Sequence, residues 1–179
     1  YDEDEAAKSE ITAINTRVYQ FHSENDTLSS LAQIYWTCRE WSYTYFNVFY
    51  KSIGSSFEKY YPESETAPIG LETVKDHIGD VYEESNGAVV FNGDKFGLHT
   101  RVFINSNGLP TYEAKDVGLA VKKWADYSFD KSIIITGNDI VEDMKVVMKS
   151  IEGSLPAATK RTTHLTNGQV KQAGGVKMS

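Results

Sequence analysis

The chain has 179 residues, with 18 basic and 25 acidic side chains, a formal net charge of -7 and 40% hydrophobic residues. This length fits one globular domain that buries a core without disulfides or metal clusters. Cys38, the single cysteine, excludes an intramolecular disulfide and a cysteine-rich zinc site. No apolar run approaches the length of a membrane span and no basic-then-apolar leader opens the chain, so we expect a soluble cytoplasmic protein with no membrane partner.

Two N-terminal stretches carry apolar residues at three- and four-residue steps, which predicts helices. The first helix is expected over about 4–22, behind acidic residues that favour the positive end of a helix dipole. The second follows Asp26 or Thr27, either of which can cap it, and ends near Gly54. We expect the two helices to pack as a helical hairpin over about 1–56.

The second of these helices carries an aromatic stripe formed by Tyr35, Trp41, Tyr45 and Phe49. Such a stripe could stack nucleic-acid bases, but stacking sites also need cations that follow the phosphate backbone. Only Arg39 and Lys51 lie among these residues. The sequence therefore favours a stripe that is buried in the core.

Short strands and turns are expected from Phe57 onward, as a small β-rich insertion over about 57–110. Residues 88–91 and 101–105 are rich in Val, Ile and Phe, and the pairs Asn92-Gly93 and Asn107-Gly108 are typical of hairpin turns. Together these signals predict a small antiparallel sheet.

The last part of the chain, about 111–179, alternates helix and strand signals. A helix is predicted over about 111–126, the apolar run 132–136 ends at Gly137, and a second helix and an extended stretch follow over about 139–152 and 162–171. A β-branched run followed by glycine and a helix is typical of a buried parallel strand. The predicted fold class is therefore α/β.

Tyr112 and Asp116 stand four residues apart, so both side chains fall on one face of the helix predicted over 111–126. A carboxylate can pair bidentately with a guanidinium group, and a phenol can donate a hydrogen bond or offer its ring face. On spacing alone, an exposed pair without function is the simpler interpretation. A second face of this helix is expected to point into the core; it comprises Ala114, Val117, Gly118, Val121 and Trp124.

A series of longer motifs runs through the chain. Residues 97–124 read GLHTRVFINSNGLPTYEAKDVGLAVKKW, and IIITGND, THLTNGQVK and a final KMS follow them. Upstream come WSYTYFNVFYKSIG, KYYPESETAPIGL and VYEESNGAVVF. In motif order and spacing, nearly the whole chain resembles the catalytic domain of an arginyl-tRNA synthetase. The resemblance implies a fragment of a class I synthetase with a Rossmann-like parallel sheet, and its third part, about 111–179, would be the second half of the nucleotide-binding core.

What the resemblance implies for function is an arginine-tRNA ligase. Such an enzyme activates L-arginine with ATP to arginyl-adenylate and transfers the arginyl group to tRNA. Tyr112 and Asp116 match the Tyr and Asp of the family's PTYxxxD element, which hold the arginine side chain. Here the family assignment agrees with the chemistry of the pair.

The resemblance also implies an ATP site, with Mg²⁺ accompanying the nucleotide. The final KMS matches the start of the family's KMSKS loop, and in it Lys177 would be catalytic by stabilising charge that develops on the phosphates. The residues implied to bind ATP are Gly137, Gly168, Gln169, Val170, Lys177, Met178 and Ser179. No histidine has a partner at metal-ligand spacing, so no metal site built from side chains is predicted.

Some positions depart from the family pattern. Residues 77–80 look like the HxGH element that binds ATP, but Asp80 replaces its second histidine, and the segment is predicted to be a helix end capped by Gly79. Ile140 stands where the family usually has Gln, and the second lysine of the KMSKS loop is absent. We therefore expect the isolated chain to be inactive, with tRNA held mainly by other parts of a parent enzyme. The alternative is a noncatalytic arginine-binding or protein-interaction module derived from the synthetase core.

Overall fold

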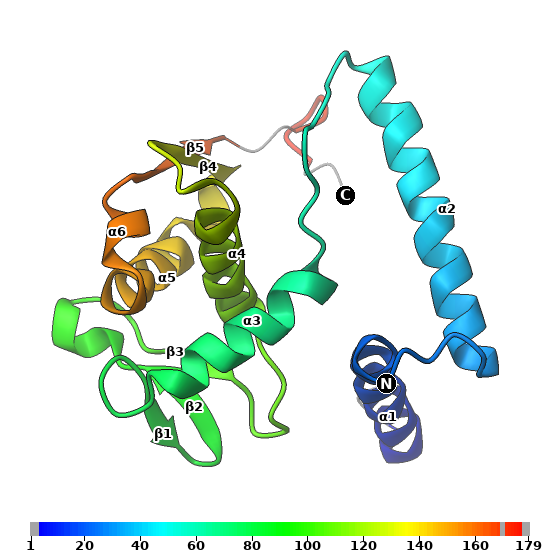
Figure 1. Cartoon of the computed structure of the whole chain (residues 1–179), viewed down its shortest axis with the longest axis horizontal. Helices are drawn as coiled ribbons and strands as arrows, with labels where there is room; N and C mark the ends of the chain where they lie inside the picture. The colour runs from blue at the N-terminus through cyan, green and yellow to red at the C-terminus, as the bar shows by residue number, and fades with distance from the viewer. Residues whose placement is uncertain (1–3, 169–170, 177–179) are drawn as a thin grey trace. The chain divides into compact units, whose positions relative to one another are not determined.

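A computed structural model describes residues 4–168 and 171–176. The chain forms two compact units, one ending at Tyr60 and the other beginning at Tyr61 (Figure 1). Among the described residues, none of the helices combines the length and the apolar character needed to cross a bilayer.

The first unit consists of helices α1 (Glu5–Ser23) and α2 (Ser30–Ser52), close to the predicted bounds. The Asp4 carboxylate caps α1 by accepting hydrogen bonds from the backbone amides of Ala6 and Ala7, at 2.9 and 3.1 Å. Ser29, rather than Asp26 or Thr27, caps α2. Asp26 instead organises the connecting turn, because its carboxylate accepts hydrogen bonds from the backbone amides of Leu28 and Ser29.

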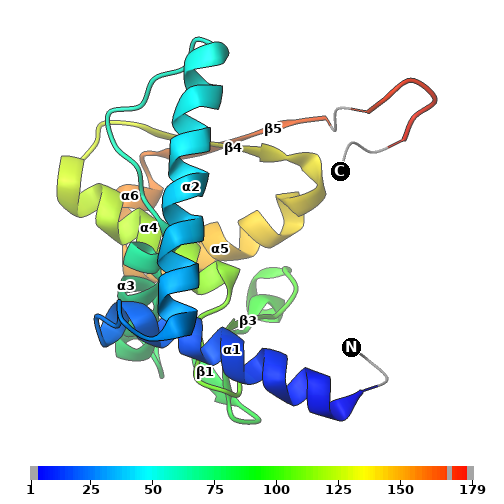
Figure 2. The ribbon, with the colours of Figure 1, turned by 90° about the vertical axis from the view of Figure 1, so that its right-hand side faces the viewer.

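The two helices meet only around their connecting turn. There the phenol of Tyr35 lies 2.7 Å from Nε2 of His22, and the ring centroids of Tyr35 and Phe21 are 5.6 Å apart. The Trp36 indole donates a hydrogen bond to the carbonyl of Asp26 at 2.8 Å. Figure 2 shows α1 and α2 leaving the turn in different directions. They therefore do not pack along their lengths as the predicted hairpin would.

The burial predicted for the aromatic stripe of α2 is wrong for most of its members. Trp41 and Tyr45 are 70% and 66% exposed, Phe49 is exposed as well, and only Tyr35 is half-buried. The physical reason is that α1 covers α2 only near the turn, so the described part of this unit offers nothing for the rest of the stripe to pack against.

The second unit begins with α3 (Glu63–Asp76) and a three-stranded antiparallel sheet of β1 (Glu83–Ser85), β2 (Ala88–Phe91) and β3 (Arg101–Ile104), with η1 (Gly93–Phe96) before β3. The predicted antiparallel sheet is confirmed. Its hairpin turn is Asn86-Gly87, whose backbone φ angles of 50° and 77° are those of a two-residue hairpin. Asn92-Gly93, predicted to be such a turn, opens η1 instead.

Helix α4 (Tyr112–Tyr127) crosses α3 at two glycines. A Cβ on Gly70 would lie 1.9 Å from the carbonyl oxygen of Ala114, and a Cβ on Gly118 would lie 2.0 Å from that of Thr66. No side chain fits at either position, so the two backbones approach as closely as helices can. Ala114, Val117 and Gly118 are buried there, as predicted for this face of the helix.

The third part of the second unit is an α/β arrangement. Strand β4 (Ser132–Gly137) is followed by η2 (Asn138–Ile140), α5 (Val141–Ser154) and α6 (Pro156–Thr159), and β5 (Thr162–Asn167) pairs with β4 in parallel. The predicted parallel strand is confirmed, within a sheet of two strands. One face of β4 packs on the core through Ile134, whereas Ile135 on the other face is 69% exposed, so the strand is not buried on both faces as predicted.

The hydrophobic core of the second unit lies where α3, α4, α5 and the antiparallel sheet meet. Its largest fully buried side chains include Tyr82 and Phe103, whose rings pack at a centroid distance of 5.0 Å. The core residues are Val74, Tyr82, Phe91, Phe103, Ile104, Ala114, Val117, Met144, Val146, Val147 and Ile151.

Candidate functional site

The carboxyl ends of β4 and β5 form a common edge. In the parallel register Gly137 lies opposite Asn167, so Gly137 and Gly168, 31 positions apart in the sequence, come to the same edge of the sheet. Beneath them a hydrogen bond joins Thr136 and His164 across the strands, at 2.8 Å between Oγ1 and Nε2. Ligands of α/β sheets bind outside the carboxyl ends of parallel strands, which makes this edge the candidate site.

Gly137 has a local structural role at this edge. Its φ of -65° is an ordinary conformation, so the glycine is not required by backbone strain. A Cβ at this position would lie 2.4 Å from Oδ1 of Asp139, because that carboxylate folds back over the end of β4. A larger side chain here would displace Asp139 from the strand end.

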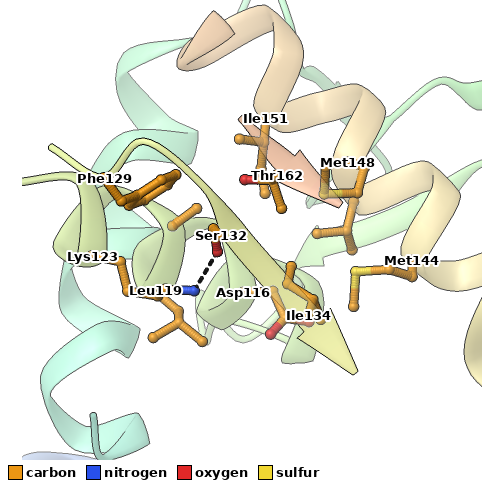
Figure 3. Close-up of a pocket in the computed structure, with 12 residues that line it drawn as sticks. Asp116, Leu119, Lys123, Phe129, Ser132, Ile134, Met144, Met148, Ile151 and Thr162 are labelled. Carbon is orange, nitrogen blue, oxygen red and sulfur yellow. Dashed lines mark hydrogen bonds between the residues drawn. The ribbon is translucent and has the colours of Figure 1, made fainter. Parts of the chain in front are cut away.

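The first turns of α4 lie toward the same edge. The short connection 128–131 reverses the chain between α4 and β4, so the helix begins near the point where the strand ends. Figure 3 shows Asp116 of α4 beside Ile134 of β4, where both line one small cavity. The predicted arginine-binding carboxyl and the predicted ATP-binding glycine therefore lie at the same end of one helix-strand pair.

Asp116 faces a mostly apolar cavity of about 60 Å³. Burial raises the pKa of this carboxyl to about 6, and the negative charges of Glu113 and Glu63 raise it further. Within the described residues no hydrogen bond or ion pair to Asp116 is found, so its negative charge is uncompensated. The other lining residues are Leu119, Ala120, Lys123, Phe129, Ser132, Ile134, Met144, Val147, Met148, Ile151 and Thr162.

Lys123 is the cation that lines this cavity. Its ammonium donates a hydrogen bond to Oγ of Ser132 at 2.7 Å and lies 5.7 Å from the ring centroid of Phe129 (Figure 3). Burial lowers the pKa of Lys123. The cavity is smaller than ordinary ligand pockets of about 300–1,000 Å³, so entry of a ligand group requires side chains to move.

Tyr112 stands in a different environment from Asp116. Its side chain is 73% exposed and does not line the cavity. The Lys115 ammonium lies 4.8 Å from the centroid of its ring and forms an ion pair with Glu63 at 2.7 Å. The structure thus places Tyr112 and Asp116 on adjacent turns, the first open to solvent and the second largely enclosed.

A charged network beside this site was not predicted from the sequence. The Arg101 guanidinium donates to Oε1 of the buried Glu113 from Nε at 2.8 Å, and its Nη1 lies 3.4 Å from Asp143. Nε2 of His99 lies 3.1 Å from the same Asp143 carboxylate. These residues come from β3, α4, α5 and the loop before β3, so no local spacing could reveal that they meet.

Some predicted site residues have no described structure. Gln169, Val170, Lys177, Met178 and Ser179, all assigned to ATP, lie outside the described residues. Segment 77–80 is the end of a helix, as predicted: α3 stops at Asp76, and Gly79 adopts a φ of 99° in the following turn. Nδ1 of His77 lies 2.8 Å from the carbonyl oxygen of Thr73 one turn earlier.

Comparison with known proteins gives a consistent result. No protein-family model matches the chain. It is 32% identical over 105 residues to an arginine-tRNA ligase of Porphyromonas gingivalis strain W83, which covers 58% of this chain and 18% of that protein. A second arginine-tRNA ligase, from Amoebophilus asiaticus, is 29% identical over 133 residues, covering 73% of this chain and 22% of that one.

The fold also has a solved counterpart. The crystal structure of arginyl-tRNA synthetase from Plasmodium falciparum matches with a TM-score of 0.67 and 17% identity, over 86% of this chain and 28% of that one. The chain spans about a fifth of the length of the curated relatives it matches. The resemblance read from the motifs is thereby confirmed, and the chain is a homologue of part of the arginyl-tRNA synthetases.

Proposed function

We propose that this chain contributes the arginine-binding edge of an arginyl-tRNA synthetase and part of its ATP-binding edge. In the whole protein, arginine and ATP would form arginyl-adenylate, and the arginyl group would pass to tRNA in the cytoplasm. Homology to arginine-tRNA ligases supports the family, and the position of Asp116 supports the arginine site.

The observation that carries the proposal is the enclosed, uncompensated carboxyl of Asp116. Keeping a carboxylate in an apolar cavity is unfavourable, and this is reflected in its raised pKa. A guanidinium group entering from the strand edge would pair with both carboxylate oxygens and remove that penalty. Strongly perturbed groups in clefts are typical of functional sites.

Tyr112 would act at the mouth of the same site. Its ring already has a cation beside it, the Lys115 ammonium, and its phenol is open to solvent. A guanidinium could take the place of that ammonium against the ring face, or accept no bond from the ring and leave the phenol to bind another polar group of the substrate. Tyr112 would then orient arginine while Asp116 selects its charge.

ATP would lie beside Gly137 and Gly168, which share the carboxyl edge of the strands. Gln169, Val170, Met178 and Ser179 are proposed to contact the nucleotide, with Lys177 as the catalytic charge that stabilises its phosphates. Among the described residues no cluster of three or more His, Cys, Asp or Glu side chains is placed to hold a metal. We propose that Mg²⁺ enters with the ATP phosphates, and we assign no step to it.

The experiment that tests the arginine site follows the Asp116 carboxyl by ¹³C NMR during pH titrations of the whole chain. Without ligand its pKa should be near 6, and millimolar arginine should lower it, because a nearby cation favours the carboxylate. Citrulline, which replaces the guanidinium with a neutral urea, should leave the pKa in place. A carboxyl pKa that responds equally to both ligands, or to neither, contradicts the proposal.

A kinetic test uses a complete synthetase that contains this segment. Asp116→Asn should raise the arginine requirement far more than the ATP requirement, with a loss on the order of 2–5 kcal/mol because a buried cation is left unpaired. Tyr112→Phe should lose about 1–3 kcal/mol if its hydroxyl makes a buried hydrogen bond to substrate. Asp130→Asn, which removes an exposed carboxylate of the same unit, is the matched control. Equal effects of Asp116→Asn on arginine and ATP would assign Asp116 a structural role.

A further inference from the structure

Helix α2 carries an exposed apolar stripe that the proposed function does not use. Its members follow steps of four, three, four and three residues, the spacing of a helix-pairing seam. Four of them, Ile34, Trp41, Tyr45 and Val48, are 61%, 70%, 66% and 64% exposed, and the fifth, Cys38, is also exposed. We call Ile34, Cys38, Trp41, Tyr45 and Val48 the α2 seam.

The α2 seam lies on the face of the helix opposite to the one that packs within its own unit. Ala32 is fully buried, and Trp36 is half-buried against the turn that joins the helices. Ile34 and Cys38 each follow one of these residues by two positions, a rotation of about 200° around the helix. Within the described part of this unit, α2 thus has one covered face and one uncovered face.

The surroundings of the α2 seam are electrically neutral. No charged residue occurs between Glu40 and Lys51, a span that holds the lower half of the seam. The positions that flank the seam there are occupied by Ser42, Thr44 and Phe49. A partner of opposite charge would have no counterpart on this face. A second copy of the same face meets no like-charge repulsion, so the seam is complementary to itself.

The exposed area is sufficient for pairing. Aromatic side chains such as Trp41 and Tyr45 present about 150–250 Å² each when uncovered. At the observed exposures, the seam and Phe49 together offer on the order of 600 Å² per copy, so a pair would bury about 1,200 Å². This is the lower end of the range for specific protein interfaces.

We propose that the α2 seam pairs with the same seam on a second copy of this chain, as a two-helix interface with Trp41 and Tyr45 at its centre. Pairing would remove the most exposed aromatic side chains of the first unit from water. The result is a symmetric dimer with the second units outside the seam interface.

Sedimentation velocity of the whole chain at increasing micromolar concentration tests the pairing. The 20.1 kDa chain should shift toward twice that mass, and Trp41→Glu should remain monomeric, with helix content checked by circular dichroism. Ile135→Glu removes an equally exposed apolar side chain from β4 and should still dimerise. A monomeric wild-type chain, or a dimer lost in Ile135→Glu but retained in Trp41→Glu, would overturn the proposal.

Cys38 supplies a second readout at the middle of the seam. In a parallel pair the two Cys38 thiols face one another, and in an antiparallel pair centred on the seam they are offset by about three residues, or about 4.5 Å along the axis. A short bis-maleimide should therefore join two wild-type chains through Cys38 in either orientation. The double variant Cys38→Ser/Glu40→Cys moves the thiol to the far side of α2 and should give little product. Equal cross-linking by both proteins would show random collision and would also overturn the proposal.

Discussion

Helices α2 and α4 carry the same kind of apolar pattern and have opposite fates. On α4, Ala114 and Val117 are fully buried where the helix crosses α3, whereas on α2 Trp41 and Tyr45 remain open to solvent. Both patterns predict a helix, and both helices form. The difference shows that periodicity determines which residues share a face, whereas burial depends on whether another element reaches that face.

The largest expected effect comes from closing the gap between α3 and α4. Gly118→Ala places a methyl group 2.0 Å from the Thr66 carbonyl oxygen and should destabilise the second unit by about 3 kcal/mol or more, because backbone must shift to admit it. Ser42→Leu, which adds more bulk on the exposed side of α2, should change the free energy of unfolding by about 0.5 kcal/mol or less. Urea unfolding, followed through amide resonances of each unit, measures both. Equal midpoints for Gly118→Ala and wild type would refute the close crossing.

Removing a cation sharpens the comparison. Arg101→Met leaves the buried Glu113 carboxylate without its guanidinium and should cost about 2 kcal/mol, a value reduced from that of fully buried pairs because Arg101 is 37% exposed. Adding Glu113→Leu should recover much of the loss. Arg39→Met on α2 removes a guanidinium that lies over the rings of Trp36 and Tyr43 and should cost at most about 1 kcal/mol. The same urea experiment ranks the three proteins, and equal losses at Arg39 and Arg101 would contradict this account.

A pH series separates the function of Asp116 from stability. Its folded pKa of about 6 lies above its ordinary value of 3.8, so the folded state binds this proton more tightly than the unfolded state does. The resulting penalty is absent below pH 3.8, grows as the pH rises toward 6 and stays constant above it. Asp116→Asn should therefore stabilise the second unit at pH 8 by about 2 kcal/mol, at about 1.4 kcal/mol per pKa unit with partial exposure discounted. The gain should vanish below pH 4, and Asp130→Asn should show no such trend.

The smallest expected effect concerns local capping in the first unit. Asp4→Ala removes the acceptor of two amide hydrogen bonds and should cost α1 about 1 kcal/mol, seen as faster hydrogen exchange of its first amides. Asp4→Asn retains an acceptor and should behave like wild type. The start of α4 depends instead on tertiary contacts, because the Thr111 hydroxyl donates to the carbonyl of Val102 at 2.8 Å. Unchanged exchange in Asp4→Ala would show that packing, not capping, holds α1.

Local sequence was sufficient for the elements and for the chemistry of the candidate site. Apolar spacing located α1, α2, α4 and α5 to within a few residues, since side chains three and four apart share a helix face. Tyr112 and Asp116 were identified by residue type, spacing and motif. The Asn86-Gly87 hairpin was also readable in the sequence, as an asparagine-glycine pair between short strands, and it was not chosen.

Only the tertiary structure decided which of these groups meet and which are enclosed. Gly70 and Gly118 lie in different helices, and their pairing depends on how two backbones cross. The raised pKa of Asp116 requires the apolar lining contributed by β4 and α5, and the partners of Arg101 come from two other helices. The α2 seam stays exposed because no described element of its own unit covers it. Burial and charge environment depend on contacts between distant segments, so they are determined by the packing of elements rather than by the residues that form each one.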